Sequence, residues 1–113
     1  MSALNWAAEF PGSILACDLN GTVLEMNEKA AEMYQRDGGR DLVGKNLLEC
    51  HPEPARTKLK QLLETGESNI YTIEKSGIKK LIYQAPWFQE GRRSGVVELA
   101  LEIPSGLRHL IRK

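Results

Sequence analysis

The sequence predicts an α+β domain in which a five-stranded antiparallel sheet carries short helices and one longer helix on a single face. Segments rich in β-formers occur at both ends of the chain, and helix-forming segments lie between them. After residue 69 the hydrophobic period changes from helical spacing to strict alternation. A run of strands, then helices, then strands is typical of a domain whose helices cover one side of one antiparallel sheet.

Length and composition are those of a single small domain. The chain has 113 residues, of which 42% are hydrophobic and 27% are charged, so it can bury a core without a metal or a disulfide. Its 15 Lys and Arg residues balance 15 Asp and Glu residues. A neutral chain lacks the basic excess that nucleic acids and anionic membranes attract, so we expect neither as a partner.

The lack of a targeting signal and the small number of cysteines predict a cytoplasmic protein. No apolar run approaches the ~20 residues that cross a bilayer, and no basic start precedes an apolar stretch at the N-terminus. Cys17 and Cys50 are too few for a disulfide framework, and free thiols in a reducing compartment are the simpler interpretation.

The N-terminal third predicts a short helix followed by a hairpin. Residues 1–9 place apolar side chains at helical spacing, and Pro11-Gly12 ends the pattern. The runs at residues 13–18 and 22–26 favour strands and flank turn-forming residues. Asn27 then suits the cap of a helix at residues 28–36.

The middle of the chain predicts short helical pieces and one longer helix, and the last third predicts three strands. The helical segments are residues 41–43, 46–50 and 55–64. The strands are residues 69–74, 78–88 and 94–103, separated by Lys75-Ser76-Gly77 and Gln89-Glu90-Gly91. We expect the first and last strands to pair, which makes five.

Short motifs in a fixed order carry a family resemblance. They are Asp18-Leu19-Asn20-Gly21-Thr22-Val23, Asn27 with Ala30-Ala31, Leu42-Val43-Gly44-Lys45, Ala85-Pro86, and Gly91 with Gly95-Val96-Val97. In this order they resemble the PAS family of sensor domains over about residues 13–103. The resemblance implies a flanking helix at residues 1–12, a PAS-like domain at residues 13–103, and a tail at residues 104–113.

The resemblance also implies a small cavity between the sheet and its helices, and such a cavity is the default binding site. Strand alternation then predicts which side chains face it, with the alternating apolar residues of the last strand on a dry inner face and Glu98 and Glu102 on a wet outer one. The expected lining residues are Tyr71, Ile73, Leu81, Tyr83 and Leu99. Ordinary core packing is the alternative role for each of them.

Two cofactor branches of the family can be compared with the sequence. In the flavin-binding light sensors a Cys follows Gly-x-Asn, whereas here Leu47 follows Gly44-Lys45-Asn46, so we do not expect a flavin adduct. In haem-type oxygen sensors a His lies on the long helix after Pro-Glu-Pro-x-Arg. This chain has that stretch at residues 52–56, but the matching downstream position is Leu59 and the helix contains no His.

Haem remains a candidate cofactor through Cys50-His51-Pro52, which resembles a turn in some small single-domain PAS proteins. Thiol and imidazole groups are both competent haem ligands, and His51 is the preferred one. The alternative is a packing Cys and a His whose ring bridges the turn. Two adjacent residues cannot supply a four-ligand zinc site, so no metal site is predicted.

The segment around Asp18 also offers an enzymatic alternative. The segment around Asp18 is similar to the nucleophile motif of haloacid-dehalogenase-type phosphatases, but the general acid/base position is Asn20, and an amide cannot exchange a proton in that role. A tight turn is the better interpretation, because Asp and Asn side chains bond to nearby backbone. No catalytic residue is predicted.

The resemblance implies a sensory module that binds a small ligand and signals through dimer or partner-protein contacts. The alternative is a ligand-free PAS module that serves only protein association. Segments flanking the sheet commonly form the dimer contact in this family, so Leu4, Trp6 and Phe10 are the expected contacts of a homodimer.

Overall fold

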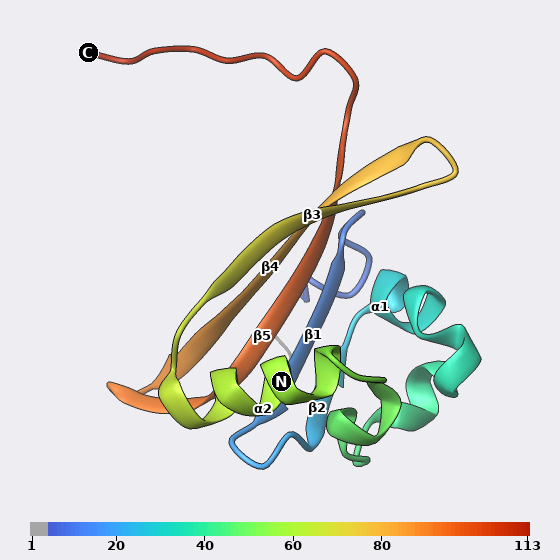
Figure 1. Ribbon diagram of the computed structural model, residues 1–113, viewed down its shortest axis with the longest axis vertical. Coiled ribbons are helices and arrows are strands. Elements are labelled where there is room, and N and C mark those ends of the chain that lie inside the picture. Colours follow the sequence, from blue (N-terminus) through green and yellow to red (C-terminus); the bar gives the residue numbers. More distant parts are fainter. Residues whose placement is uncertain (1–4) are drawn as a thin grey trace.

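The computed structural model describes residues 5–113, and from residue 13 onward its strands and helices follow one another in the expected order (Figure 1). The predicted α+β class is confirmed. The strands are β1 (Ser13–Asp18), β2 (Val23–Met26), β3 (Asn69–Lys75), β4 (Ile78–Gln89) and β5 (Arg92–Ile103). The helices are α1 (Glu28–Met33) and α2 (Ala55–Thr65), with 3₁₀ turns η1 (Gln35–Asp37), η2 (Gly39–Leu42) and η3 (Leu47–Cys50).

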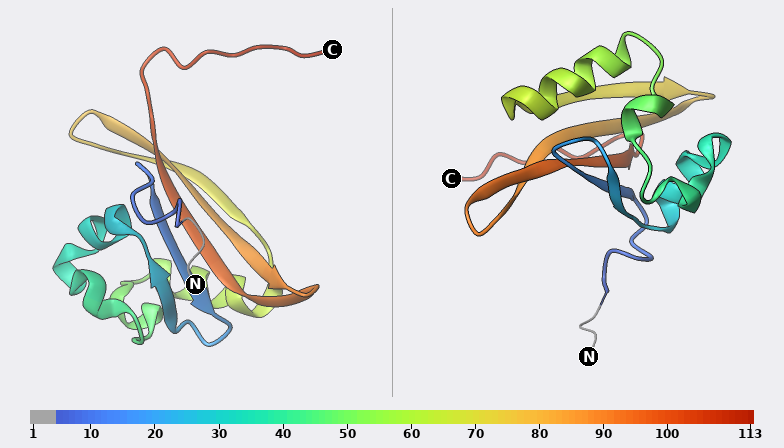
Figure 2. Two further views of the ribbon diagram at one scale, coloured as in Figure 1. Left: turned by 180° about the vertical axis from the view of Figure 1, so that it is seen from behind. Right: turned by 90° about the horizontal axis from the view of Figure 1, so that it is seen from below.

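The five strands form one antiparallel sheet in the order β2-β1-β5-β4-β3. The first and last strands pair as predicted, with Ser13 opposite Ala100 and Cys17 opposite Val96. Figure 2 (right) shows α2 on one side of the sheet and the N-terminal segment on the other. The tip of the β3–β4 hairpin and the C-terminal tail extend beyond the helices (Figure 1).

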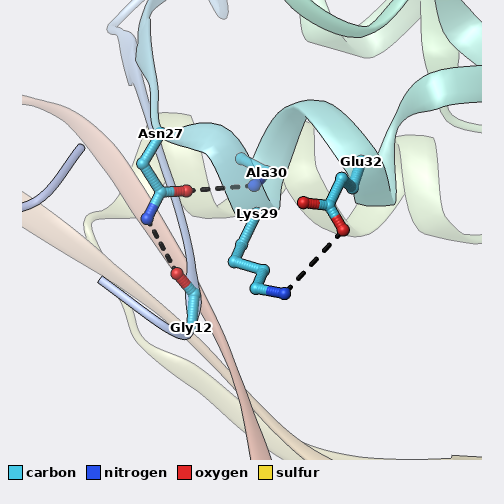
Figure 3. A network of polar contacts seen from close by, with 5 residues as sticks. All are labelled: Gly12, Asn27, Lys29, Ala30 and Glu32. Carbon is cyan, nitrogen blue, oxygen red and sulfur yellow. Dashed lines mark hydrogen bonds and ion pairs between the residues drawn. The ribbon is translucent and has the colours of Figure 1, made fainter. Parts of the chain in front are cut away.

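Asn27 joins three parts of the fold through its side chain. The Oδ1 atom accepts hydrogen bonds from the Ala30 and Ile14 backbone N–H groups, both at 3.0 Å. The Nδ2 group donates to the Gly12 and Ala7 carbonyls at 2.8 and 2.9 Å. Figure 3 shows the amide between Gly12 and the first turn of α1. The predicted helix cap therefore also holds β1 and the N-terminal segment in place.

Helix α2 packs on the sheet through an apolar stripe, with Leu59, Leu62 and Leu63 buried at helical spacing. Gly66, at φ 75°, ends the helix and donates its N–H to the Leu62 carbonyl. The Arg93 guanidinium, which comes from β5, donates to the Leu63 carbonyl at 2.7 Å. This bond satisfies a carbonyl that the end of the helix leaves free.

A close approach between strands requires Gly95. The Trp87 indole Nε1 donates to the Cys17 carbonyl at 2.9 Å across the intervening strand β5. A Cβ at Gly95 would collide with that carbonyl oxygen and lie 2.8 Å from the indole nitrogen. The glycine therefore allows β1 and β4 to be joined over β5.

Asp18 forms the turn between β1 and β2, as the turn interpretation predicts. Its Oδ1 atom accepts from the backbone N–H groups of Asn20 and Thr22 at 2.9 and 3.0 Å. Both bonds are local, so they account for this motif without any catalytic role.

The predicted N-terminal helix is not present in the described part of the segment. Residues 6–9 form turns, with the Ala8 N–H bonded to the Asn5 carbonyl and the Phe10 N–H to the Ala7 carbonyl, each at 3.3 Å. The remaining expected helical residues, Leu4 among them, lie outside the described part of the chain. Within residues 5–113 no helix is long and apolar enough to cross a membrane.

The faces assigned to β4 and β5 are wrong. The register pairs Gln84 with Glu98, which are both buried on the inner face, and pairs Tyr83 with Leu99 on the outer face. The β3–β4 loop has two residues, Ser76 and Gly77, instead of the expected three, so the inner and outer sets of β4 exchange. The sets of β5 exchange with them, because Tyr83 pairs with Leu99 and Gln84 pairs with Glu98. The residues that move to the outer face are Leu81, Tyr83, Ala85, Val97, Leu99 and Leu101.

Candidate functional site

A cavity of about 160 Å³ lies between the inner face of the sheet, the end of α1 and the start of α2. Its walls come from six segments of the chain, so only the folded domain assembles it. The lining residues are Met33, Tyr34, His51, Ala55, Lys58, Asn69, Tyr71, Ile73, Ile82, Gln84 and Glu98. Tyr71 and Ile73 on the edge strand β3 are 42% and 40% exposed, so the cavity opens to solvent at that edge.

The lining includes a chain of polar side chains that ends at Glu98. Glu98 is buried, with 6% of the residue exposed. It accepts the Tyr34 hydroxyl at 2.6 Å and the Gln84 Nε2 group at 2.8 Å. Gln84 in turn accepts from Asn69 Nδ2 at 2.9 Å. Three strands and the end of α1 are therefore tied together by donors that converge on one carboxylate.

Tyr34 connects this network to the helical layer. Burial, followed by the negative charge of Glu98, raises the pKa of the Tyr34 phenol far above its ordinary value. The phenol therefore stays protonated and remains a donor to the carboxylate. The Tyr34 ring also stacks on the His51 ring, with ring centroids 6.3 Å apart and planes at 26°.

The expected lining residues divide between the two faces of the sheet. Tyr71 and Ile73 line the cavity. Leu81, Tyr83 and Leu99 belong to the outer face, so their assignment to the cavity is corrected. Sequence reasoning missed Glu98, Gln84 and Asn69. The two-residue turn at Ser76-Gly77 carries the signal that would have placed Gln84 inward, whereas the inward position of Glu98 also depends on a register irregularity between Trp87 and Phe88.

The expected haem ligands lie in different surroundings. His51 lines the cavity, whereas Cys50 packs against the hydrophobic core. Burial raises the pKa of the Cys50 thiol, which disfavours the thiolate that binds metals. Among residues 5–113, no group of three His, Cys, Asp or Glu side chains is placed to hold a metal ion.

Haem does not fit this cavity. Sites for drug-sized ligands occupy roughly 300–1,000 Å³, and the volume here is about 160 Å³. The His51 ring, which lines the cavity, also stacks on the Tyr34 ring. A compact ligand that bonds to the polar network suits the site better.

The outer face of the sheet carries a continuous apolar surface. It consists of side chains that alternate with the inner set on β1, β4 and β5: Ile14, Ala16, Leu81, Tyr83, Ala85, Trp87, Val97, Leu99, Leu101 and Ile103. We call this set the outer apolar face. Of the expected dimer contacts, Phe10 packs edge-on against Trp6 at 6.0 Å, and Trp6 is 71% exposed. Leu4 lies outside the described residues.

Comparisons with known proteins identify the fold. The C-terminal domain of a Streptococcus mutans protein is 19% identical with a TM-score of 0.69, and the match covers 85% of this chain and 78% of that chain. The Aer2 receptor from Vibrio cholerae, described as a dual PAS-heme oxygen sensor, is 16% identical with a TM-score of 0.59 and coverages of 82% and 95%. VqmA from Vibrio cholerae is 19% identical with a TM-score of 0.64, and this chain spans 49% of its length.

At these identities the solved structures establish the architecture alone, and no curated protein matches the chain. The family model for the PAS fold matches residues 6–76, which is more than half of the 113 residues. Together with the five-stranded sheet and its helices on one face, this match shows that the chain belongs to the PAS family.

Proposed function

We propose that this PAS domain is a sensory module that binds a small ligand in the cavity beneath β3, β4 and β5 and signals through contacts of its outer apolar face with a second copy or a partner protein. The observation that carries the proposal is the Glu98 carboxylate, which lines the cavity while it is 6% exposed. Burying a charged group is unfavourable unless bonds compensate it, so its retention favours a binding role.

Strand β5 gives the cavity a direct physical connection to the outer apolar face. Glu98 points inward, and its chain neighbours Val97 and Leu99 point outward. A ligand that moves Glu98 therefore also moves the outer apolar face. Signalling needs only that the ligand binds two arrangements of this strand with different affinities.

The proteins of similar fold make ligand binding a reasonable expectation. Aer2 is described as a dual PAS-heme oxygen sensor, and VqmA is described as bound to DPO. Those ligands belong to those proteins, and the cavity of this chain has its own polar lining. The alternative is a ligand-free module that serves only association, and the outer apolar face favours it as much as it favours the sensor.

Native mass spectrometry of freshly purified protein, with an absorption spectrum, separates these two functions. We expect a mass increment in the wild type that disappears in Ala55→Phe, because Ala55 lines the cavity and a larger ring would fill it. Gln61→Phe on the exposed side of α2 is the matched control and should keep the increment. A bare mass for the wild type, with no change in thermal stability on adding small-molecule mixtures, would favour the association module.

A further inference from the structure

We propose that the ligand of this cavity is a small organic cation, a protonated amine of a few heavy atoms, with the Glu98 carboxylate as its counter-ion. The inference rests on the proposed ligand-binding function and names the chemical class of the ligand.

The first argument is that Glu98 has no positively charged partner among the described side chains. Both groups that donate to its carboxylate, the Tyr34 hydroxyl and the Gln84 amide, are neutral. Among residues 5–113, the ion pair with a nitrogen–oxygen distance within 4.0 Å is Lys29–Glu32, on the surface of α1. No Lys, Arg or His nitrogen of these residues therefore lies within 4.0 Å of the Glu98 carboxylate. Burying a charged group is costly unless it is both hydrogen-bonded and paired with an opposite charge, and the ligand can supply that charge.

The second argument is the direction of the hydrogen bonds. Asn69 donates to Gln84, Gln84 donates to Glu98, and Tyr34 donates to the other carboxylate oxygen. All of these donors point toward Glu98, which is the pattern of an ionised acceptor. A carboxylate has about four lone-pair sites and two are used here, so N–H donors of a ligand have places to bind.

The third argument is the size and lining of the cavity. Two tyrosines, Tyr34 and Tyr71, line it together with apolar residues such as Ile82. Aromatic rings attract cations through their faces, and apolar walls receive the methyl or methylene groups of an alkylamine. A volume of about 160 Å³ restricts the ligand to a compact one.

Lys58 provides an internal check on the same electrostatics. It is exposed on α2 and is one of the residues that line the cavity, so it contributes a positive charge near the opening. A fixed positive charge there opposes the entry of a cationic ligand. Removing it should therefore strengthen binding of an amine and weaken binding of an anion.

The test uses three probes of nearly equal shape and different charge, tert-butylammonium, tert-butanol and pivalate. Each is titrated into the full chain at neutral pH, with NMR detection of backbone amides and of the Asn69 and Gln84 side-chain amides. We expect tert-butylammonium to bind roughly tenfold more tightly than tert-butanol, because charge-assisted hydrogen bonds are about twice as strong as neutral ones. Pivalate should not bind.

Variants assign the effect to Glu98. Glu98→Gln should weaken ammonium binding by roughly tenfold. Glu102→Gln, four residues further along the same face of β5 and exposed, should leave it within about twofold. Lys58→Gln should tighten ammonium binding, and this variant lies on an exposed helix position, so it keeps the test valid if Glu98→Gln does not fold.

Equal or tighter binding of tert-butanol or pivalate would overturn the cation assignment and leave the proposed ligand-binding function standing. Ammonium binding that is unchanged in Glu98→Gln or weakened in Lys58→Gln would also overturn it. If none of the three probes binds, the cation assignment is overturned too. The proposed function itself fails only if the native mass spectrum also shows the bare mass.

Discussion

At the scale of single residues, Tyr34 and Glu98 hold the interior together. Tyr34 follows the last turn of α1, and Glu98 lies on β5, 64 residues further along the chain. Their 2.6 Å hydrogen bond is buried. Because the phenol is desolvated and faces a carboxylate, its pKa is raised, and the folded protein retains a proton that an unfolded chain would release at high pH.

Tyr34→Phe tests this bond. We expect it to lower the free energy of unfolding by about 1.5–3 kcal/mol, the range for a hydrogen bond to a charged group. Urea denaturation monitored by circular dichroism measures this change. Tyr83→Phe, on the outer apolar face, is the control and should change it by less than about 0.5 kcal/mol.

The free energy of unfolding of Tyr34→Phe should also depend on pH differently from that of the wild type. A raised folded-state pKa contributes stability that is complete below the unfolded value of about 10 and is lost as pH rises above it, by up to about 1.4 kcal/mol per pH unit. The wild type should therefore lose stability between about pH 10 and 11. Tyr34→Phe should lose less over this interval, since one contributing group is gone. Equal losses in both proteins would contradict the role given to the phenol.

At the scale of elements, local signals predicted the chain order well and the strand faces poorly. Asn27 and the α2 stripe depend on neighbours in sequence, so their pattern predicts them. The inner face depends on loop length. Ser76-Gly77 is a two-residue turn with φ values of 53° and 79°, and it places Tyr71 opposite Ile82. A loop of three residues would instead pair Tyr71 with Leu81, and the opposite set of β4 side chains would then face inward.

The apolar content of β5 reinforced that error. Alternating apolar residues usually face the core, but here they form the outer apolar face, and the inner face carries Glu98 between buried Val96 and Ala100. A sheet that buries one face under helices and carries a second apolar face on its other side breaks the usual assignment. Single-chain patterns cannot distinguish these two uses of an apolar face.

The prediction at the scale of elements concerns the stability lost when Asn27 is replaced. Asn27→Ala removes the cap of α1 and leaves the Ile14 N–H and the Ala7 and Gly12 carbonyls without these partners. We expect a loss of about 3 kcal/mol or more in the free energy of unfolding, from the cap and from the unsatisfied buried groups together. Equilibrium urea denaturation measures it. Asn20→Ala in an exposed turn is the matched control, and a similar loss in both variants would contradict the joining role of Asn27.

At the scale of the whole molecule, one sheet separates two surfaces of different chemistry. Figure 2 (right) shows α2 on one side of the sheet and the N-terminal segment on the other. The polar cavity lies on the side of α2, and the outer apolar face lies on the opposite side. Contiguous exposed apolar surface on a small domain marks an association site. The proposed sensor and the alternative association module both use this face.

Tyr83→Glu tests association through the outer apolar face. Tyr83 is 39% exposed, lies opposite Leu99 at the centre of that face, and is on the side of the sheet away from the cavity. A carboxylate there would be desolvated in a dimer but hydrated in a monomer, so we expect sedimentation velocity to change from a wild-type homodimer to a monomer. Gln61→Glu makes the same charge change on the exposed side of α2 and should remain dimeric. A monomeric wild type at high concentration, or a Tyr83→Glu variant that still dimerises, would show that the two copies do not meet through this face.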